Sequence, residues 1–217
     1  SSPQAPILIL PRRLHSGGLA LSVAPGLDTV GAMLPYTPLH IILMEGSPPL
    51  VMTSGNRTGL PIAKDEEEAL AQLGQIADYF LVHDRPIFRR CDDSVVRVMP
   101  SWGPSCRGGY VQIIRRSRGF VPGAISLPLP QGASPADLPV VAALGAEMKN
   151  VVCLTRGNQA YLSQHLGEMD TVEGVENLRE ALGQMASLLG VEPAVLACDM
   201  HPSFSLTGLA AQFPPER

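Results

Sequence analysis

The most concentrated chemical feature of the sequence is a set of arginines near its middle. Eight of the 16 Lys and Arg residues fall between positions 85 and 118, and all eight are arginines: Arg85, Arg89, Arg90, Arg97, Arg107, Arg115, Arg116 and Arg118. The guanidinium group presents a rigid fork of donors that matches phosphate or carboxylate oxygens two at a time. The cluster therefore predicts an anion-binding site, and a solvated basic face is the alternative.

Two short polar segments accompany the arginines. The turn from Thr53 to Asn56 exposes hydroxyls and backbone N–H groups of the kind that line phosphate sites, although an ordinary Asx turn explains it about as well. Asp92 and Asp93 stand among the arginines, where they are candidates to hold Mg²⁺ or to orient guanidinium groups. The alternative for these aspartates is a set of internal salt bridges.

A further group of polar residues follows the predicted strands of the C-terminal part. These residues lie in the segments 145–150 (GAEMKN), 163–167 (SQHLG) and 199–202 (DMHP). Polar residues at successive strand ends converge on one edge of an open sheet, where ligands bind. The three segments together therefore predict a second site.

Composition narrows the class of protein. With 45% hydrophobic and 17% charged residues the chain is expected to be globular, and its net charge is −4. The four cysteines show no CxxC pair or metal-ligand spacing, which favours reduced thiols in a cytoplasmic protein. No signal peptide, membrane-length apolar run or Walker A sequence is visible. A sequence pI near 5.7 and 5% aromatic residues argue against a nucleic-acid-binding module.

The elements that must position these residues indicate a mixed α/β chain in two parts. A proline-rich linker over 122–139 separates residues 1–121 from residues 140–217. In the first part, strands are expected at 7–10, 50–53, 80–82, 94–99 and 111–114, with helices starting at 37 and, behind a capping box of Asp65 and Glu68, over 65–80. In the second part, strands at 140–144, 151–155, 160–163 and 194–198 and helices over 175–189 and 203–213 give the order β-β-β-α-β-α. That order opens an incomplete ribonuclease-H-like fold.

The motifs, taken in order, resemble the HypF family of hydrogenase-maturation carbamoyltransferases over essentially the whole chain. The matching segments are TSGN (53–56), HDRPI (83–87), DDSV (92–95), RRSRG (115–119) with VP (121–122), LGAEMKN (144–150), LSQHLG (162–167) and DMHP (199–202). The resemblance implies the C-terminal portion of a YrdC-like adenylate-forming domain, followed by the start of a transferase domain of the actin-like ATPase superfamily.

The resemblance also implies an activity. Carbamate derived from carbamoyl phosphate would react with ATP, in the presence of Mg²⁺, to give carbamoyl-adenylate. The carbamoyl group would then pass to the C-terminal cysteine of a HypE-like partner and become a cyanide ligand of a [NiFe] centre. By position, the nucleotide and phosphate site would comprise Thr53, Ser54, Asn56, Arg85, Asp92, Asp93, Ser94, Arg115, Arg116 and Arg118. The transfer site would comprise Glu147, Lys149, Asn150, His165 and Asp199.

Departures from the family pattern set further expectations. Nothing matching the basic triphosphate-gripping motif of YrdC-like domains precedes Ser54, and the histidines that bind a transition metal in the transferase domain are not in this sequence. The chain is therefore expected to be a fragment that does not catalyse the full reaction alone. A threonylcarbamoyl-adenylate synthase is the closest alternative, and the second part of the chain argues against it.

Overall fold

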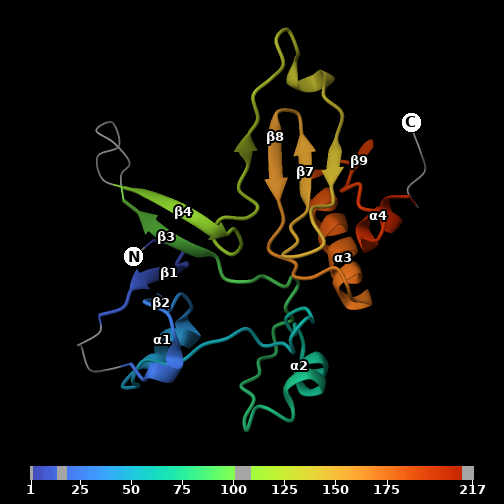
Figure 1. Cartoon of the computed structure of the whole chain (residues 1–217). Coiled ribbons are helices and arrows are strands. Elements are labelled where there is room, and N and C mark those ends of the chain that lie inside the picture. The colour runs from blue at the N-terminus through green and yellow to red at the C-terminus, as the bar shows by residue number, and fades with distance from the viewer. Residues whose placement is uncertain (1, 14–18, 101–108, 212–217) are drawn as a thin grey trace. The chain divides into compact units, whose positions relative to one another are not determined.

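The computed structural model describes residues 2–13, 19–100 and 109–211. The chain divides into two compact units (Figure 1): unit 1 is Ser1–Thr53 with Asp93–Phe120, and unit 2 is Ser54–Asp92 with Val121–Arg217. Each unit has its own sheet, of four strands in unit 1 and five in unit 2, so the mixed α/β class is confirmed. Because unit 2 is assembled from two separate stretches, the domain boundaries at 121 and 139 stay a prediction.

Unit 1 is built on a mixed sheet with the strand order β2-β1-β3-β4. The strands are β1 (Ile7–Pro11), β2 (Thr29–Ala32), β3 (Val95–Met99) and β4 (Tyr110–Arg115). β1 runs parallel to β3 and antiparallel to β2, and β3 is antiparallel to β4. The short helices η1 (Leu21–Val23) and α1 (Pro38–Met44) complete the unit, and the Thr37 hydroxyl caps α1 by accepting a hydrogen bond from the His40 backbone N–H.

Three predicted strands of the first part are confirmed as β1, β3 and β4, but two others are wrong. Residues 50–53 and 80–82 form no strand, and apolar side chains such as Val51 (78% exposed) and Leu81 (69% exposed) face solvent there. Apolar runs of three or four residues carry no information about whether a partner strand lies beside them. The strand β2 was missed, because TVGA is short and contains glycine.

The second predicted helix of the first part is shorter than expected. α2 spans Glu66–Leu73 and ends at Gly74, so the expected continuation to residue 80 is wrong. Asp65 caps α2 by accepting from the Glu68 N–H at 2.8 Å. The Glu68 carboxylate, however, accepts from the Lys64 N–H instead of returning to Asp65, so the capping box is only half formed.

Unit 2 contains the order of elements expected for the C-terminal part. β6 (Val141–Ala143), β7 (Cys153–Arg156), β8 (Gln159–Leu162), α3 (Val172–Leu189), β9 (Val195–Ala197) and α4 (Ser205–Ala210) follow one another. The sheet order is β5-β8-β7-β6-β9, with β6 parallel to β9 and every other pair antiparallel. β5 (Ile125–Ser126) and the short helix η2 (Pro135–Asp137) lie in the predicted linker. Phe213, the expected end of the last helix, lies outside the described residues, as do Cys106 and Arg107.

The buried core of unit 2 lies between its sheet and α3. Leu144, Val152 and Leu154 from the sheet side meet Leu178 and Met185 of α3, and all five are at most 1% exposed. Thr171 caps the start of α3, and Gly190 ends the helix in the left-handed conformation that glycine adopts without strain. Among the described residues, no helix has the length and apolar character needed to cross a membrane.

Candidate functional site

The loop that follows β4 in unit 1 is fixed by a buried serine. Ser94, which is 0% exposed, donates from its hydroxyl to the Arg118 carbonyl at 2.9 Å and accepts from the Ser117 backbone N–H at 2.8 Å. Both hydrogen bonds join the start of β3 to the loop at residues 116–119. Ser94 therefore shapes the arginine-bearing loop, and its predicted contact with a nucleotide stays a prediction.

Among the residues of this loop, Arg118 makes the most extensive set of contacts. Its guanidinium donates to Asp93 Oδ1 at 2.8 Å and to the carbonyls of Gln4 and Ala5 at 3.2 and 2.8 Å. The same group lies 3.4 Å from the centre of the Tyr36 ring, in a cation–π contact. Asp93 thus orients an arginine, and Arg118 links the loop to the N-terminal segment of unit 1.

Arg115 and Arg116 follow one another where β4 ends, and both are half-buried. Arg115 pairs with Val95 across the β3–β4 ladder, where a register shift interrupts the regular pairing. The Arg116 guanidinium carbon lies 6.0 Å from the centre of the Phe120 ring. Because the β3–β4 pairing holds the residues before this point and Ser94 and Arg118 hold the loop after it, these two arginines have a preorganised backbone, which is the property that charge-stabilising sites require.

The turn predicted to bind phosphate lies in unit 2 from Ser54 onward, and Thr53 is the last residue of its stretch in unit 1. Thr53 and Ser54 are exposed. Asn56 Nδ2 donates to the carbonyls of Arg57 and Leu60 at 3.0 and 2.9 Å, which closes the loop. Its Oδ1 is buried and has no partner among the described residues.

Two predicted site residues from distant parts of the sequence meet in unit 2. Asp92 Oδ2 lies 2.9 Å from His165 Nδ1, and the two side chains are 14% and 17% exposed. A carboxylate in this position fixes the orientation of the imidazole and the ring nitrogen that faces it. Sequence reasoning had assigned Asp92 to the nucleotide site and His165 to the transfer site. Arg85 is exposed and has no side-chain partner among the described residues.

The strand ends of unit 2 converge as the polar segments predicted. β7 is antiparallel to both β6 and β8, and β9 is parallel to β6, so β6, β8 and β9 all run in one direction. The segments after these three strands therefore lie at the same edge of the sheet. Backbone hydrogen bonds confirm that two of them are adjacent, because Asn150 N donates to Gly167 O at 2.7 Å and Met169 N donates to Glu147 O at 2.9 Å.

Asn150 and Glu147 are two polar residues at this edge whose side chains are enclosed in part or in full. Asn150 is 0% exposed and donates to the carbonyls of Leu144 and Ala146 at 2.8 and 2.6 Å. Glu147 accepts from the Ser205 N–H at 3.2 Å through Oε1. The other side-chain oxygens, Asn150 Oδ1 and Glu147 Oε2, are buried without a partner among the described residues. Unpaired buried oxygens are unusual in folded proteins and are ready to accept hydrogen bonds from a ligand or water.

The remaining residues predicted for transfer are exposed. Lys149 adopts a φ of 52°, an uncommon value for a non-glycine residue, and its side chain faces solvent. Asp199 follows β9, and its carbonyl, not its carboxylate, accepts from the Thr207 hydroxyl at 2.9 Å. The edge thus combines a fixed amide and glutamate with an exposed lysine and aspartate, and their catalytic roles stay predictions.

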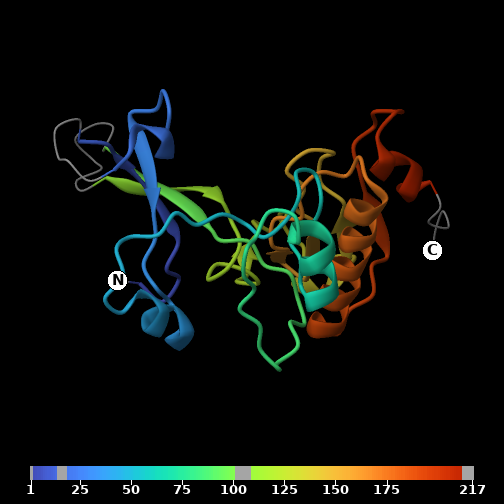
Figure 2. The ribbon, with the colours of Figure 1, turned by 90° about the horizontal axis from the view of Figure 1, so that it is seen from below.

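Sequence reasoning missed an ion-pair network within unit 2. Arg90 donates to Glu68 of α2, to Glu180 of α3 at 3.2 Å and to the Ile62 carbonyl at 2.8 Å. Lys64 pairs with the second oxygen of Glu180 at 2.9 Å. Figure 2 shows the α2 segment beside α3, the two elements that the network joins. The partners are up to 116 positions apart, so no spacing rule predicts these pairs. The opposite charges of the residues were the only signal in the sequence.

The acidic residues do not form a metal centre in the described part of the chain. No group of three or more His, Cys, Asp or Glu side chains there is arranged to hold a metal ion. Asp92 and Asp93 have oxygens of the kind that Mg²⁺ prefers, but their carboxylates bond separately to His165 and Arg118. The role of the two aspartates toward Mg²⁺ stays a prediction.

Comparison with known proteins identifies the class of both parts. Residues 1–117 match the family described as Telomere recombination, the Sua5/YciO/YrdC family, and residues 136–217 match the HypF Kae1-like domain. The chain therefore joins a YrdC-type region to a Kae1-like region of the HypF type. It belongs to the HypF family.

Individual relatives agree with this assignment. Carbamoyltransferase HypF2 of Cupriavidus necator is 41% identical over 98% of this chain and 27% of its own length, and carbamoyltransferase HypF of Rhodobacter capsulatus is 44% identical over 93% and 25%. A crystal structure of full-length HypF in the phosphate- and nucleotide-bound form has a TM-score of 0.82 and 39% identity, covering 97% of this chain and 31% of that one. The chain spans about a quarter of the length of the curated relatives it matches.

Proposed function

We propose that these 217 residues form part of a cytoplasmic carbamoyltransferase that makes carbamoyl-adenylate and passes the carbamoyl group to a protein thiol. The observation that carries the proposal is the joining of a YrdC-type and a HypF Kae1-like region in one chain, at 41–44% identity to proteins named carbamoyltransferases. The same observation favours this activity over threonylcarbamoyl-adenylate synthesis.

The chemistry assigns a task to each group of residues. A carbamate oxygen attacks the α-phosphorus of ATP and displaces pyrophosphate, so negative charge develops on phosphate oxygens. Arg115 and Arg116, preorganised by Ser94 and Arg118, are suited to stabilise that charge. Mg²⁺ bound with ATP would neutralise part of that charge, and Asp92 and Asp93 are the predicted carboxylates that could help to hold it.

The edge formed by the segments after β6, β8 and β9 suits the transfer step. There a thiolate of a HypE-like partner attacks the carbamoyl carbon, and AMP leaves. The unpaired oxygens of Asn150 and Glu147 are placed to accept hydrogen bonds from the carbamoyl NH₂ group. In this proposal the transition metal of the family's transferase domain is held by residues that are not among these 217.

The proposal is tested by ATP–pyrophosphate exchange in the polypeptide that carries these residues. Exchange should depend on carbamoyl phosphate and not on threonine with bicarbonate. Arg116→Lys should lower the exchange rate at least tenfold, because lysine keeps the charge but loses the bidentate fork. The control is Arg156→Lys, on an exposed residue at the end of β7, which should leave exchange unchanged. Exchange driven by threonine with bicarbonate instead would exclude the proposed activity.

A further inference from the structure

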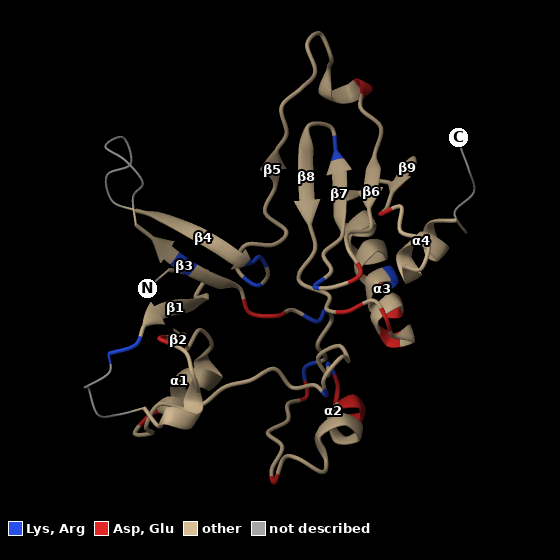
Figure 3. Ribbon diagram, in the orientation of Figure 1, with Lys and Arg blue, Asp and Glu red and all other residues tan. Residues whose placement is uncertain are grey.

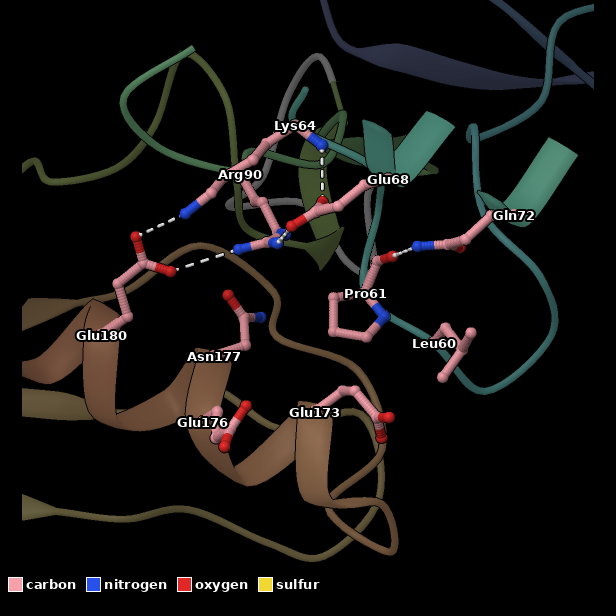
Figure 4. A pocket seen from close by; sticks show the side chains of 10 residues that line it. All are labelled: Leu60, Pro61, Lys64, Glu68, Gln72, Arg90, Glu173, Glu176, Asn177 and Glu180. Atoms are coloured by element: carbon pink, nitrogen blue, oxygen red, sulfur yellow. Dashed lines mark hydrogen bonds and ion pairs between the residues drawn. The ribbon is translucent and has the colours of Figure 1, made fainter. Parts of the chain in front are cut away.

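Unit 2 contains a cavity that none of the residues predicted for nucleotide binding or transfer lines. Its volume is about 330 Å³, near the lower end of the range for small-ligand sites. Its walls come from the loop around Leu60 and Pro61, from α2, from Arg90 and from the first turns of α3 (Figure 4). Figure 3 shows acidic residues in α2 and in the N-terminal half of α3, the two helices that contribute residues to the cavity lining.

The polar groups on one side of the cavity already form ion pairs and hydrogen bonds within the protein. Arg90 and Lys64 are paired with Glu68 and Glu180, as Figure 4 shows by dashed lines. Gln72 donates to the Pro61 carbonyl at 3.3 Å. Because these cations are already neutralised by carboxylates, they are poorly placed to attract an anion into the cavity.

The floor of the cavity, on α3, carries groups that lack partners. Asn177 is only 7% exposed, and its side-chain amide makes no hydrogen bond with any described residue. In Figure 4 its amide projects from α3 into the cavity. Polar groups in largely buried residues are usually hydrogen-bonded, so an unpaired amide at the surface of a cavity is available to a ligand or ordered water there.

Two carboxylates flank this amide. Glu173 lies four residues before Asn177 and three before Glu176, which are the spacings of neighbours on a helix face, and both glutamates line the cavity. They are exposed and form no ion pair or hydrogen bond with any described residue. With Glu68 and Glu180 they bring four carboxylates to the cavity against two cations, so the lining is net negative.

We propose that this cavity binds a small alkyl cation, either an alkylguanidinium or an alkylammonium group. The cationic head lies between the carboxylates of Glu173 and Glu176 and donates a hydrogen bond to Asn177 Oδ1. The alkyl part packs on Leu60 and Pro61, the apolar residues of the lining. A bare metal ion is a poorer match, because no metal-holding cluster of acidic side chains exists among the described residues.

The test compares two probes of the same shape. n-Butylguanidinium and its uncharged counterpart N-butylurea are titrated into ¹⁵N-labelled protein, with the Asn177 side-chain amide followed by NMR and identified by its loss in Asn177→Asp. The guanidinium probe should shift the Asn177 signal saturably, and butylurea should bind at least tenfold more weakly. Equal binding of the two probes, or no saturable shift, would overturn the proposal.

Substitutions at exposed positions test whether the probe binds in this cavity, and they leave its buried residues unchanged. The double substitution Glu173→Gln and Glu176→Gln should weaken butylguanidinium binding at least tenfold, and both positions are exposed, so folding is preserved. Glu192→Gln, which removes the same kind of charge outside the cavity, should leave binding unchanged. If the double variant binds as tightly as the parent, the cavity is not the site.

A second ligand identifies the source of the cation. Nα-acetylarginine methylamide carries the same head group attached to a peptide backbone. If it binds as tightly as butylguanidinium, an arginine side chain of a protein fits the cavity. If it binds tenfold more weakly while butylguanidinium still saturates, the ligand is a free small molecule. Both results keep the alkyl cation as the ligand, and neither depends on the proposed carbamoyltransferase activity.

Discussion

Replacing Arg90 by methionine tests whether this arginine is a structural residue or an anion ligand. Methionine keeps the apolar stem and removes three hydrogen bonds: to Glu68, to Glu180 and to the Ile62 carbonyl. The side chain is 14% exposed, whereas Glu68 and Glu180 are 32% and 37% exposed. Breaking a fully buried pair costs about 3–5 kcal/mol and a surface pair contributes about 0–1. For this half-buried network we expect a loss of about 2 kcal/mol, since water resolvates the freed carboxylates.

Urea unfolding followed by far-UV circular dichroism measures this loss, because α3, with 18 residues, dominates the helical signal and lies in unit 2. With an m-value of about 2 kcal/mol/M, the midpoint should fall by about 1 M. Arg156→Met, at an exposed arginine, is the control and should change stability by less than about 0.5 kcal/mol. If Arg90→Met unfolds like the control but no longer binds ATP, Arg90 is an anion ligand and the structural role is wrong.

Three further predictions concern unit 2. Asn150→Ala should lower its unfolding free energy by about 2–4 kcal/mol in the same urea assay, because the carbonyls of Leu144 and Ala146 lose their donor inside the core. Thr171→Ala should lower it by about 1 kcal/mol through loss of the α3 cap, with Thr171→Ser restoring the parent value. Burial raises the pKa of the Cys153 thiol, so iodoacetamide at pH 8 should modify Cys153 more slowly than exposed Cys91. Peptide mass spectrometry measures the two rates, and equal rates would contradict the prediction.

The raised pKa of Cys153 also sets the direction of one pH effect on stability. The folded state holds the thiol proton more tightly than the unfolded chain does, whose thiol titrates near 9.0. The resulting stabilisation is fully present below that pH and is lost as the pH rises above it. Cys153→Ser should remove this part of the alkaline loss, and a decline that is unchanged in the variant would assign the effect to other groups.

The elements of unit 2 were predictable because each carries a local signal. The apolar positions of α3 recur at helical spacing and the helix is bounded by Thr171 and Gly190, while the neighbouring strands are separated by tight turns. These strands also bury their apolar residues against α3, so pattern and packing agree. In unit 1, only Ala24 and Val96 are buried among the described apolar residues. Where apolar runs are not buried, as at residues 50–53, the pattern gives a false strand.

The sequence predicted those features of the candidate sites that follow from the strand topology alone. The direction of β6, β8 and β9 follows from the order of short hairpins and one helical crossover, so the convergence of the segments after them could be read from the sequence. The partners of individual side chains could not. Asp92 and His165 are 73 positions apart, and no spacing rule links them. Local chemistry therefore identified these residues as functional candidates but assigned them to two different sites.

The arginine cluster shows why residue type predicts a kind of bond but not its partner. The guanidinium fork suits carboxylates as well as phosphates, so density of arginine alone cannot separate an anion site from an internal network. Arg90 and Arg118 turn out to bond to carboxylates and backbone carbonyls of their own units. Since each is satisfied by the fold, a phosphate would have to compete with those bonds. For Arg115 and Arg116 the anion site stays a prediction, supported by the loop that the Ser94 and Arg118 contacts hold in place.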